Sequence, residues 1–341
     1  LMTRNAVVIS PHPAARECCI DAANLLARVA IDAGAPDGVI QIIKDPNIPL
    51  IEEFMKSPKT TVILATGGTP MVRSAYSSSN PAIGVGPGNA PVFVDSSADI
   101  DKAANRIVES KSFDNSVLCT NESVLITLPE VDKQLRQSLK KYGAYFCNDD
   151  DTSRLRRYLF HGAGFNIETI GRDATWIAKE CGIRVPEKTA ILVAPIDQIG
   201  IEEPLSREKL CPVLAYHVAK NRDQAIMQAR AVLRLTGAGH SAAVHAMDET
   251  VTMAFARALE VYRIVVNAPC SQGAAGFGTA LAPTFTIGTG FFGRSSIGEN
   301  IGPEHLVHWT KLAYNEDTSE EFGDYFGVGN NFSGPLPSAP E

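Results

Sequence analysis

Residues 92–127 read VFVDSSADIDKAANRIVESKSFDNSVLCTNESVLIT, and this stretch decides the fold class. The apolar runs at 92–94 and 123–127 have the composition of buried strands. Between them, residues 99–113 repeat their apolar side chains at helical spacing. A strand, a helix and a second strand in this order predict two parallel strands joined by a crossover helix.

The same alternation continues along most of the chain. It predicts further strands at 6–10, 61–65, 82–85, 144–147, 190–194, 213–218, 242–245 and 263–267. It predicts further helices from near Pro13 to Gly34 and at 70–77, 131–142, 152–159, 223–233 and 249–259. The pattern fits an α/β fold with two doubly wound, Rossmann-like units in tandem. In the first helix, Cys18, Ala22, Leu25, Leu26 and Val29 form one stripe, which we expect to face the core.

Length, charge and hydropathy exclude several classes of protein. With 341 residues the chain is long enough for about two domains at roughly 150 residues each. Its 31 Lys and Arg against 38 Asp and Glu give a net charge of −7, which disfavours a dedicated nucleic-acid or anionic-membrane binder. Apolar runs such as 190–194 are far shorter than the ~18 residues of a membrane span.

The cysteines indicate a reducing compartment. The chain has 7 of them, an odd number, and no C-x-x-C pair. We therefore expect free thiols and a cytoplasmic protein, and no secretory leader is recognisable at the start of the sequence. The chain enters a predicted strand by residue 6, so we expect it to be part of a longer polypeptide.

Three positions stand out as candidates for chemistry, and each has a plain alternative. Thr66-Gly67-Gly68 ends a strand and opens a helix, which suits a phosphate site or an ordinary turn. Cys119 lies in a polar loop, where a thiol is a nucleophile if nearby N–H groups or cations lower its pKa, or otherwise an inert loop cysteine. His240 could be a base, a phosphate contact or a hydrogen-bonded loop histidine.

Two other groups of polar residues have plainer interpretations. Glu208 by itself reads as a solvated loop charge. Glu304, His305 and His308 lack the H-E-x-x-H order and a third ligand nearby, so we interpret them as a surface helix and predict no metal site.

Seven ordered segments together resemble the aldehyde dehydrogenase superfamily, and more narrowly its CoA-acylating branch. That branch includes the aldehyde dehydrogenase half of bifunctional alcohol/aldehyde dehydrogenases and the aldehyde dehydrogenases of bacterial microcompartments. The segments are TRNA with SPHP (3–6, 10–13), ATGG (65–68), GVGPGN (84–89), FDN with Cys119 (113–115), EKLCP (208–212), GAGH (237–240) and SIGENIGP (296–303).

The resemblance implies a reaction and a set of site residues. Cys119 would be the nucleophile that forms a thiohemiacetal with an aldehyde, and hydride would then pass to NAD. His240 would lie near the reacting centre and count with Cys119 as catalytic. The resemblance also implies a set of residues that bind the cofactors NAD and CoA: Ser10, Pro11, His12, Thr66, Gly67, Gly68, Gly86 and Glu208.

Two departures from the hydrolytic aldehyde dehydrogenases point to CoA as the acyl acceptor. Those enzymes carry a water-activating glutamate near the position that Val85 occupies here. They also have Lys-Pro where this chain has Ser10-Pro11, in a pocket that CoA shares in the acylating branch. The predicted reaction therefore makes an acyl-CoA. A hydrolytic enzyme and a non-catalytic structural member of the family remain the alternatives.

The resemblance also implies an organisation and partners. Residues 1–94 would be a partial dinucleotide-binding domain, 95–275 the catalytic domain, and 276–341 a glycine-rich oligomerisation arm and tail. The family's first strands and its oxyanion-hole asparagine match no part of this chain and belong upstream of residue 3. The implied partners are a small aldehyde, a second copy of the chain in a homodimer or homotetramer, and a fused alcohol dehydrogenase or a bacterial microcompartment.

Overall fold

A computed structural model describes residues 2–162 and 164–313 of the chain. Its strands are β1 (Val7–Ile9), β2 (Ile40–Ile42), β3 (Ile63–Thr66), β4 (Ala82–Val85), β5 (Ala90–Val94), β6 (Glu122–Thr127), β7 (Ala144–Phe146), β8 (Phe160–His161), β9 (Gly164–Phe165), β10 (Ile191–Pro195), β11 (Val213–Val218), β12 (Gly239–His245) and β13 (Val261–Val266). Its α-helices are α1 (Arg16–Asp32), α2 (Ile48–Lys56), α3 (Thr69–Tyr76), α4 (Ile100–Ser112), α5 (Pro129–Lys141), α6 (Asp149–Leu159), α7 (Ala174–Glu180), α8 (Arg222–Leu235), α9 (Glu249–Ala258) and α10 (Cys270–Ala274).

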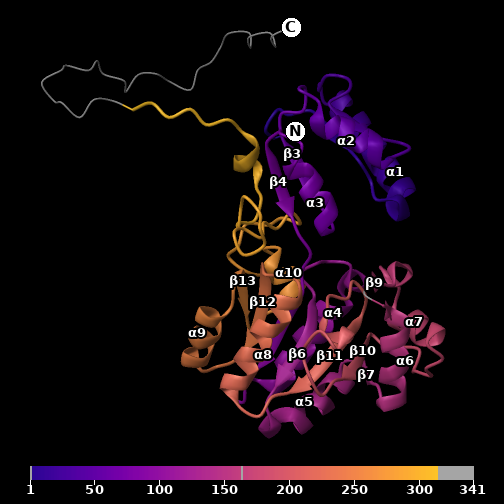
Figure 1. Ribbon diagram of the computed structural model, residues 1–341, viewed down its shortest axis with the longest axis vertical. Coiled ribbons are helices and arrows are strands. Elements are labelled where there is room, and N and C mark those ends of the chain that lie inside the picture. The colour runs from indigo at the N-terminus through magenta and orange to yellow at the C-terminus, as the bar shows by residue number, and fades with distance from the viewer. Residues whose placement is uncertain (1, 163, 314–341) are drawn as a thin grey trace, which may run out of the picture. The chain divides into compact units, whose positions relative to one another are not determined.

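Seven of these strands form one parallel sheet in the order β13-β12-β5-β6-β11-β10-β7 (Figure 1). The stretch at 92–127 supplies its two adjacent central strands, with α4 as the crossover between β5 and β6. Both strands are buried along their whole length, which explains why they read as continuous apolar runs. The predicted α/β fold with parallel strands is confirmed.

Two smaller units of the same type precede this sheet. Strands β1 and β2 pair in parallel around α1, and β3 and β4 pair in parallel around α3. The described residues up to Leu306 form one compact unit, and a second unit starts at Val307. The division into three domains stays a prediction, and residues 314–341 of the predicted arm and tail lie outside the described residues.

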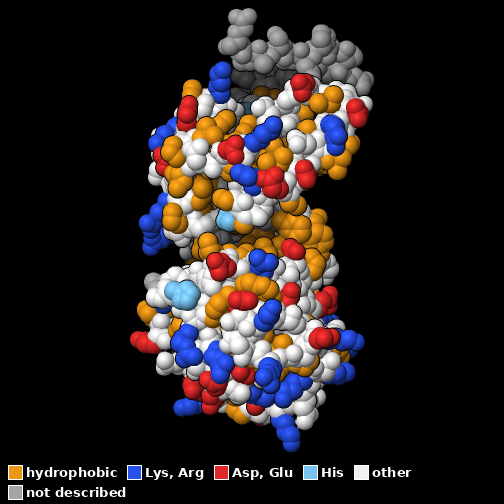
Figure 2. Space-filling model, turned by 90° about the vertical axis from the view of Figure 1, so that its right-hand side faces the viewer, with side chains coloured by type: hydrophobic (Ala, Val, Ile, Leu, Met, Phe, Trp, Pro, Cys, Tyr) orange, Lys and Arg blue, Asp and Glu red, His pale blue; other side chains and the backbone are white. Residues whose placement is uncertain are grey.

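Helix α1 differs from the sequence expectation. The predicted stripe is exposed at Cys18, Ala22, Leu25 and Val29, and the buried residues of the helix are Ala23 and Ala30. The larger apolar side chains of the stripe lie on the surface of the described chain, with Leu25 and Val29 both more than half exposed. Figure 2 shows hydrophobic side chains at the surface between charged ones. Helical spacing identified the helix, but it did not identify the face that is buried.

Candidate active site

Four loop or strand segments meet at the amino ends of the central strands. Gly88 precedes β5, Cys119 precedes β6, Glu208 lies before β11, and His240 is the second residue of β12. Because these strands are parallel, their amino ends lie at the same edge of the sheet. The parallel order therefore brings together residues that are far apart in the sequence.

The thiol of Cys119 contacts the imidazole of His240. Nε2 of His240 lies 3.1 Å from Sγ of Cys119, and its Nδ1 lies 3.0 Å from Oγ of Ser241. A neutral imidazole has one donor and one acceptor nitrogen, so when Nδ1 donates to Ser241, Nε2 accepts a hydrogen bond from the thiol. Burial, and then the charge of Arg263, lower the pKa of His240 to about 3, so this imidazole is neutral at physiological pH.

Cys119 is half-buried and holds its proton. Burial first, and then the negative charge of Glu208, raise the pKa of the thiol to about 12. The positive charge of Arg263 acts in the opposite direction and does not reverse the shift. The structure therefore does not show the pKa lowering that would activate a loop thiol.

Glu208 and Gly88 pack directly beside the cysteine. The Gly88 N–H donates a 2.9 Å hydrogen bond to Oε1 of Glu208. A Cβ atom at Gly88 would lie 2.0 Å from the carbonyl oxygen of Cys119 and 3.4 Å from Oε1 of Glu208, so only glycine fits there. Burial raises the pKa of Glu208 to about 7 against the opposing Gly88 hydrogen bond. The structure thus brings Cys119, His240 and Glu208 into one site.

The other predicted cofactor residues lie on the two small parallel units. Ser10, Pro11 and His12 follow β1, and Nδ1 of His12 accepts the Ala14 N–H at 3.2 Å. Thr66 ends β3, and Gly67 and Gly68 connect it to α3; all three are exposed. Gly68 is the N-cap of α3 without a side-chain cap. Pro70 has no N–H and the Met71 N–H donates to the Gly68 carbonyl at 3.0 Å, so this end offers an anionic ligand mainly the positive end of the helix dipole, which is compatible with a dinucleotide phosphate.

Gly86 follows β4 and also leaves open space. A Cβ atom there would approach only Oγ1 of Thr289, at 4.0 Å. Together with the uncapped end of α3, this open backbone is compatible with the implied cofactor. The roles of all these residues stay predictions.

Sequence reasoning missed Arg263, which joins the site to the glycine-rich segment. Its guanidinium is buried in β13 and donates to the backbone carbonyl of His240 at 2.8 Å and to Oδ1 of Asn300 at 2.6 Å. Its one signal in the sequence is a charged residue inside the apolar run of 261–266.

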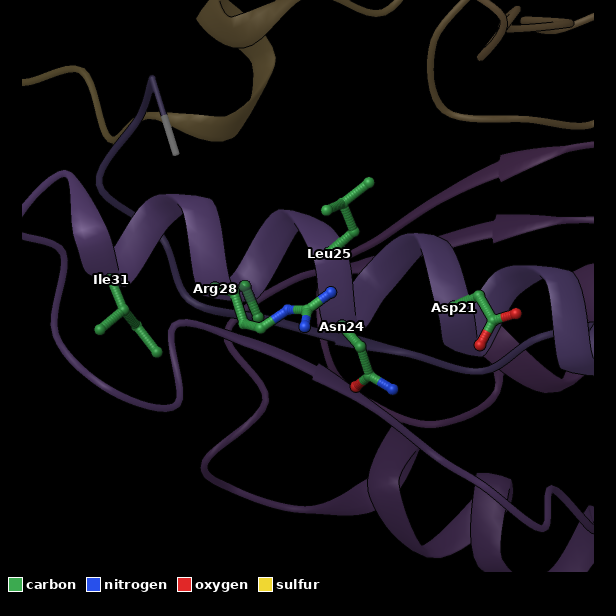
Figure 3. A pocket seen from close by; sticks show the side chains of 6 residues that line it. Asp21, Asn24, Leu25, Arg28 and Ile31 are labelled. Atoms are coloured by element: carbon green, nitrogen blue, oxygen red, sulfur yellow. The ribbon is translucent and has the colours of Figure 1, made fainter.

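The described residues also include a surface hollow that lies apart from the predicted site residues. A shallow hollow of about 620 Å³ lies along α1 (Figure 3), lined by Asp21, Asn24, Leu25, Ala27, Arg28 and Ile31, and it includes none of the predicted site residues. Over residues 2–162 and 164–313, no cluster of three His, Cys, Asp or Glu residues could hold a metal ion. No helix in that part of the chain is long and apolar enough to cross a membrane.

A parallel α/β sheet with a thiol–imidazole pair at its edge defines the structural class, and comparisons with known proteins give the family. Residues 1–152 match the model of the aldehyde dehydrogenase family. The aldehyde-alcohol dehydrogenase of Streptococcus pneumoniae is 39% identical over 322 residues, which are 92% of this chain and 36% of that protein. The chain thus spans about a third of the length of such bifunctional relatives.

Two solved structures are also similar. An acetylating aldehyde dehydrogenase from Geobacillus thermoglucosidasius has a TM-score of 0.87 and 36% identity, over 92% of this chain and 71% of that one. A propionaldehyde dehydrogenase from Rhodopseudomonas palustris, solved with bound CoA and an acylated cysteine, has a TM-score of 0.78 and 31% identity, over 85% and 66% of the two chains. The chain belongs to the aldehyde dehydrogenase family. The predicted resemblance to its CoA-acylating branch is confirmed.

Proposed function

We propose that the protein is an NAD-dependent, CoA-acylating aldehyde dehydrogenase. In this reaction an aldehyde, NAD⁺ and CoA give an acyl-CoA, NADH and a proton. The observation that carries the proposal is the 3.1 Å contact between Cys119 and His240 beside Glu208. The acylated cysteine and bound CoA of the Rhodopseudomonas palustris relative support the same chemistry here.

Cys119 forms and breaks the covalent bonds in this proposal. Its sulfur adds to the aldehyde carbon, and the thiol proton passes to the carbonyl oxygen, which becomes the hydroxyl group of the thiohemiacetal. NAD, when bound, supplies the hydride acceptor. Loss of hydride from the thiohemiacetal carbon and of the hydroxyl proton to water leaves a thioester on Cys119. The sulfur of CoA then attacks that thioester, which frees the Cys119 thiol and yields the acyl-CoA. His240 holds the thiol in place through Nε2.

Val85 favours transfer to CoA over hydrolysis. It ends β4 and is 1% exposed, and its apolar side chain cannot accept a proton from water. Without a carboxylate at position 85 to activate water, hydrolysis of the thioester is slower, and a thiol can attack it first. The hydrolytic alternative lacks this support, and the Cys119–His240 pair speaks against a purely structural role.

Acyl transfer from an acyl-CoA tests the nucleophile without aldehyde or NAD. We expect incubation with propionyl-CoA to add one propionyl group to the intact mass, and peptide mapping to place it on Cys119. The Cys119→Ser variant should gain no thioester. It serves as the control for acylation of the other six cysteines, which are all free thiols. An unmodified parent protein, or equal acylation of the variant, would contradict the proposal.

The proposal extends to assembly and place of action. The similarity to an aldehyde-alcohol dehydrogenase supports a fused or associated alcohol dehydrogenase as a partner. A homodimer or homotetramer and a cytoplasmic or microcompartment location are further parts of the same proposal. Sedimentation velocity tests the oligomer, and a monomer at micromolar concentration would contradict it.

A further inference from the structure

The backbone just before Cys119 has an unusual conformation. Asp114, Asn115 and Ser116 have φ angles of 50°, 47° and 64°, three left-handed residues in succession without a glycine. Such a conformation is unfavourable for L-residues and persists only where the surroundings hold it. Other groups must therefore hold the loop that presents the thiol.

The side chain of Asn121 holds this loop from the inside. Its Nδ2 donates to the carbonyl of Ser116 at 2.9 Å and to the carbonyl of Leu118 at 2.5 Å. The Asn121 backbone N–H also donates to the Leu118 carbonyl, at 3.0 Å. Asn121 is buried, so water does not compete for these bonds. The two carbonyls flank the segment that leads into Cys119.

The ammonium group of Lys111 fixes the amide of Asn121. It donates to Oδ1 of Asn121, which orients Nδ2 toward the loop carbonyls. It also donates to the carbonyl of Lys209 at 3.3 Å, next to Glu208. Lys111 is fully buried, a costly place for a lysine unless its donors are used. One side chain thus ties the Cys119 loop to the Glu208 loop.

We propose that Lys111 and Asn121 are positioning residues for Cys119. Lys111 sets the orientation of the Asn121 amide, the amide holds the Ser116 and Leu118 carbonyls, and the held loop keeps the thiol against His240. This inference deepens the proposed function, because it concerns the same thiol.

Alkylation of Cys119 by iodoacetamide, followed by peptide mass spectrometry, tests the inference on the full chain. Asn121→Asp keeps the size and an acceptor for Lys111 but removes both N–H donors to the loop. Lys111→Met removes the ammonium while filling its space. Lys209→Met is the matched control. Lys209 is equally buried, but its Nζ donates to the Leu205 and Arg207 carbonyls and to no residue of the Cys119 loop among the described contacts.

Releasing the loop should expose the thiol and speed its alkylation. Burial holds its pKa at about 12 rather than 9.0, so a partial return toward the ordinary value increases alkylation about tenfold or more at fixed pH. We expect this in Asn121→Asp and Lys111→Met, with the buried Cys147 and Cys270 still protected, and the parent rate in Lys209→Met. Acyl transfer from propionyl-CoA should fall by up to about 10²-fold in the same two variants.

Three results would overturn the inference. The first is a Cys119 alkylation rate in Asn121→Asp equal to that of the parent protein, and the second is an equal increase of that rate in Lys209→Met. The third is labelling of Cys147 together with Cys119 in Asn121→Asp, which would show that the Asn121 side chain holds the whole fold and not only the loop. Alkylation needs no aldehyde, NAD or CoA. A protein that alkylates as expected but accepts no acyl group would contradict the proposed function alone.

Discussion

Replacing Gly88 by alanine should disable the site by a steric route that can be calculated. The added Cβ would lie 2.0 Å from the Cys119 carbonyl oxygen, and real Cβ atoms essentially never come closer than 3.0 Å to such a neighbour. The difference, 3.0 − 2.0 = 1.0 Å, is the least by which the backbone around Cys119 or Gly88 must move. The two atoms nearest to the added Cβ, the carbonyl oxygen and carbonyl carbon of Cys119, belong to the backbone. No flexible side chain can therefore absorb the shift.

Two effects follow from this displacement. Overpacking of this kind costs ~1–3 kcal/mol of folding free energy. That lowers the melting temperature by at most about 2–4 °C per kcal/mol, because the shift falls as the chain becomes longer. A misplacement of about 1 Å at a reacting group costs up to ~10²-fold in rate. We therefore expect Gly88→Ala to fold with a modestly lowered melting temperature and to lose nearly all acyl transfer to Cys119.

Differential scanning fluorimetry and intact-mass acylation by propionyl-CoA measure the two effects. Gly200→Ala is the matched control, because the nearest neighbour of its Cβ would be Oε2 of Glu202 at an ordinary 3.5 Å. Parent-like acylation and melting in Gly88→Ala would refute the packing described for this site. Loss of acylation in Gly200→Ala as well would show that the assay responds to any glycine substitution.

Three further predictions concern the same site. Cys119→Ala should abolish both aldehyde oxidation and acyl-CoA reduction, measured by NADH absorbance. Its circular dichroism should stay that of the parent, because the residue is half-buried in a loop. Activity above a trace would contradict the assignment of Cys119 as the nucleophile. Val85→Glu should raise the ratio of free acid to acyl-CoA, since general-base catalysis raises the rate ~10²–10⁴-fold where the carboxylate reaches the thioester. A parent protein that releases acid without CoA as fast as it makes acyl-CoA with it would contradict the acylating assignment. Alkylation of Cys119 in the free protein should rise about tenfold per pH unit well below its pKa of about 12, whereas a plateau above pH 9.0 would show an ordinary thiol. Because this pKa is raised on folding, the neutral thiol favours the folded state below pH 9.0, and that contribution is lost as the pH rises toward 12.

The sequence by itself determined the class of fold. Alternating apolar runs and helical patterns are local signals, and they located most strands of the main sheet to within a few residues. Short elements with weak patterns were missed, such as β2, α2 and α7, because three to nine residues give too few turns or alternations to detect. The family segments also named Cys119, His240 and Glu208 before any contact was known.

The tertiary structure alone decided how these residues act on one another. Cys119 and His240 are 121 positions apart, and they meet only because β6 and β12 flank β5 in one parallel sheet. The raised pKa of Cys119 is likewise a non-local property, since burial and the charge of Glu208 depend on packing that no short pattern encodes. For the same reason the buried face of α1 escaped prediction: periodicity marks an apolar stripe, and the partner that packs against the helix selects the side that is buried.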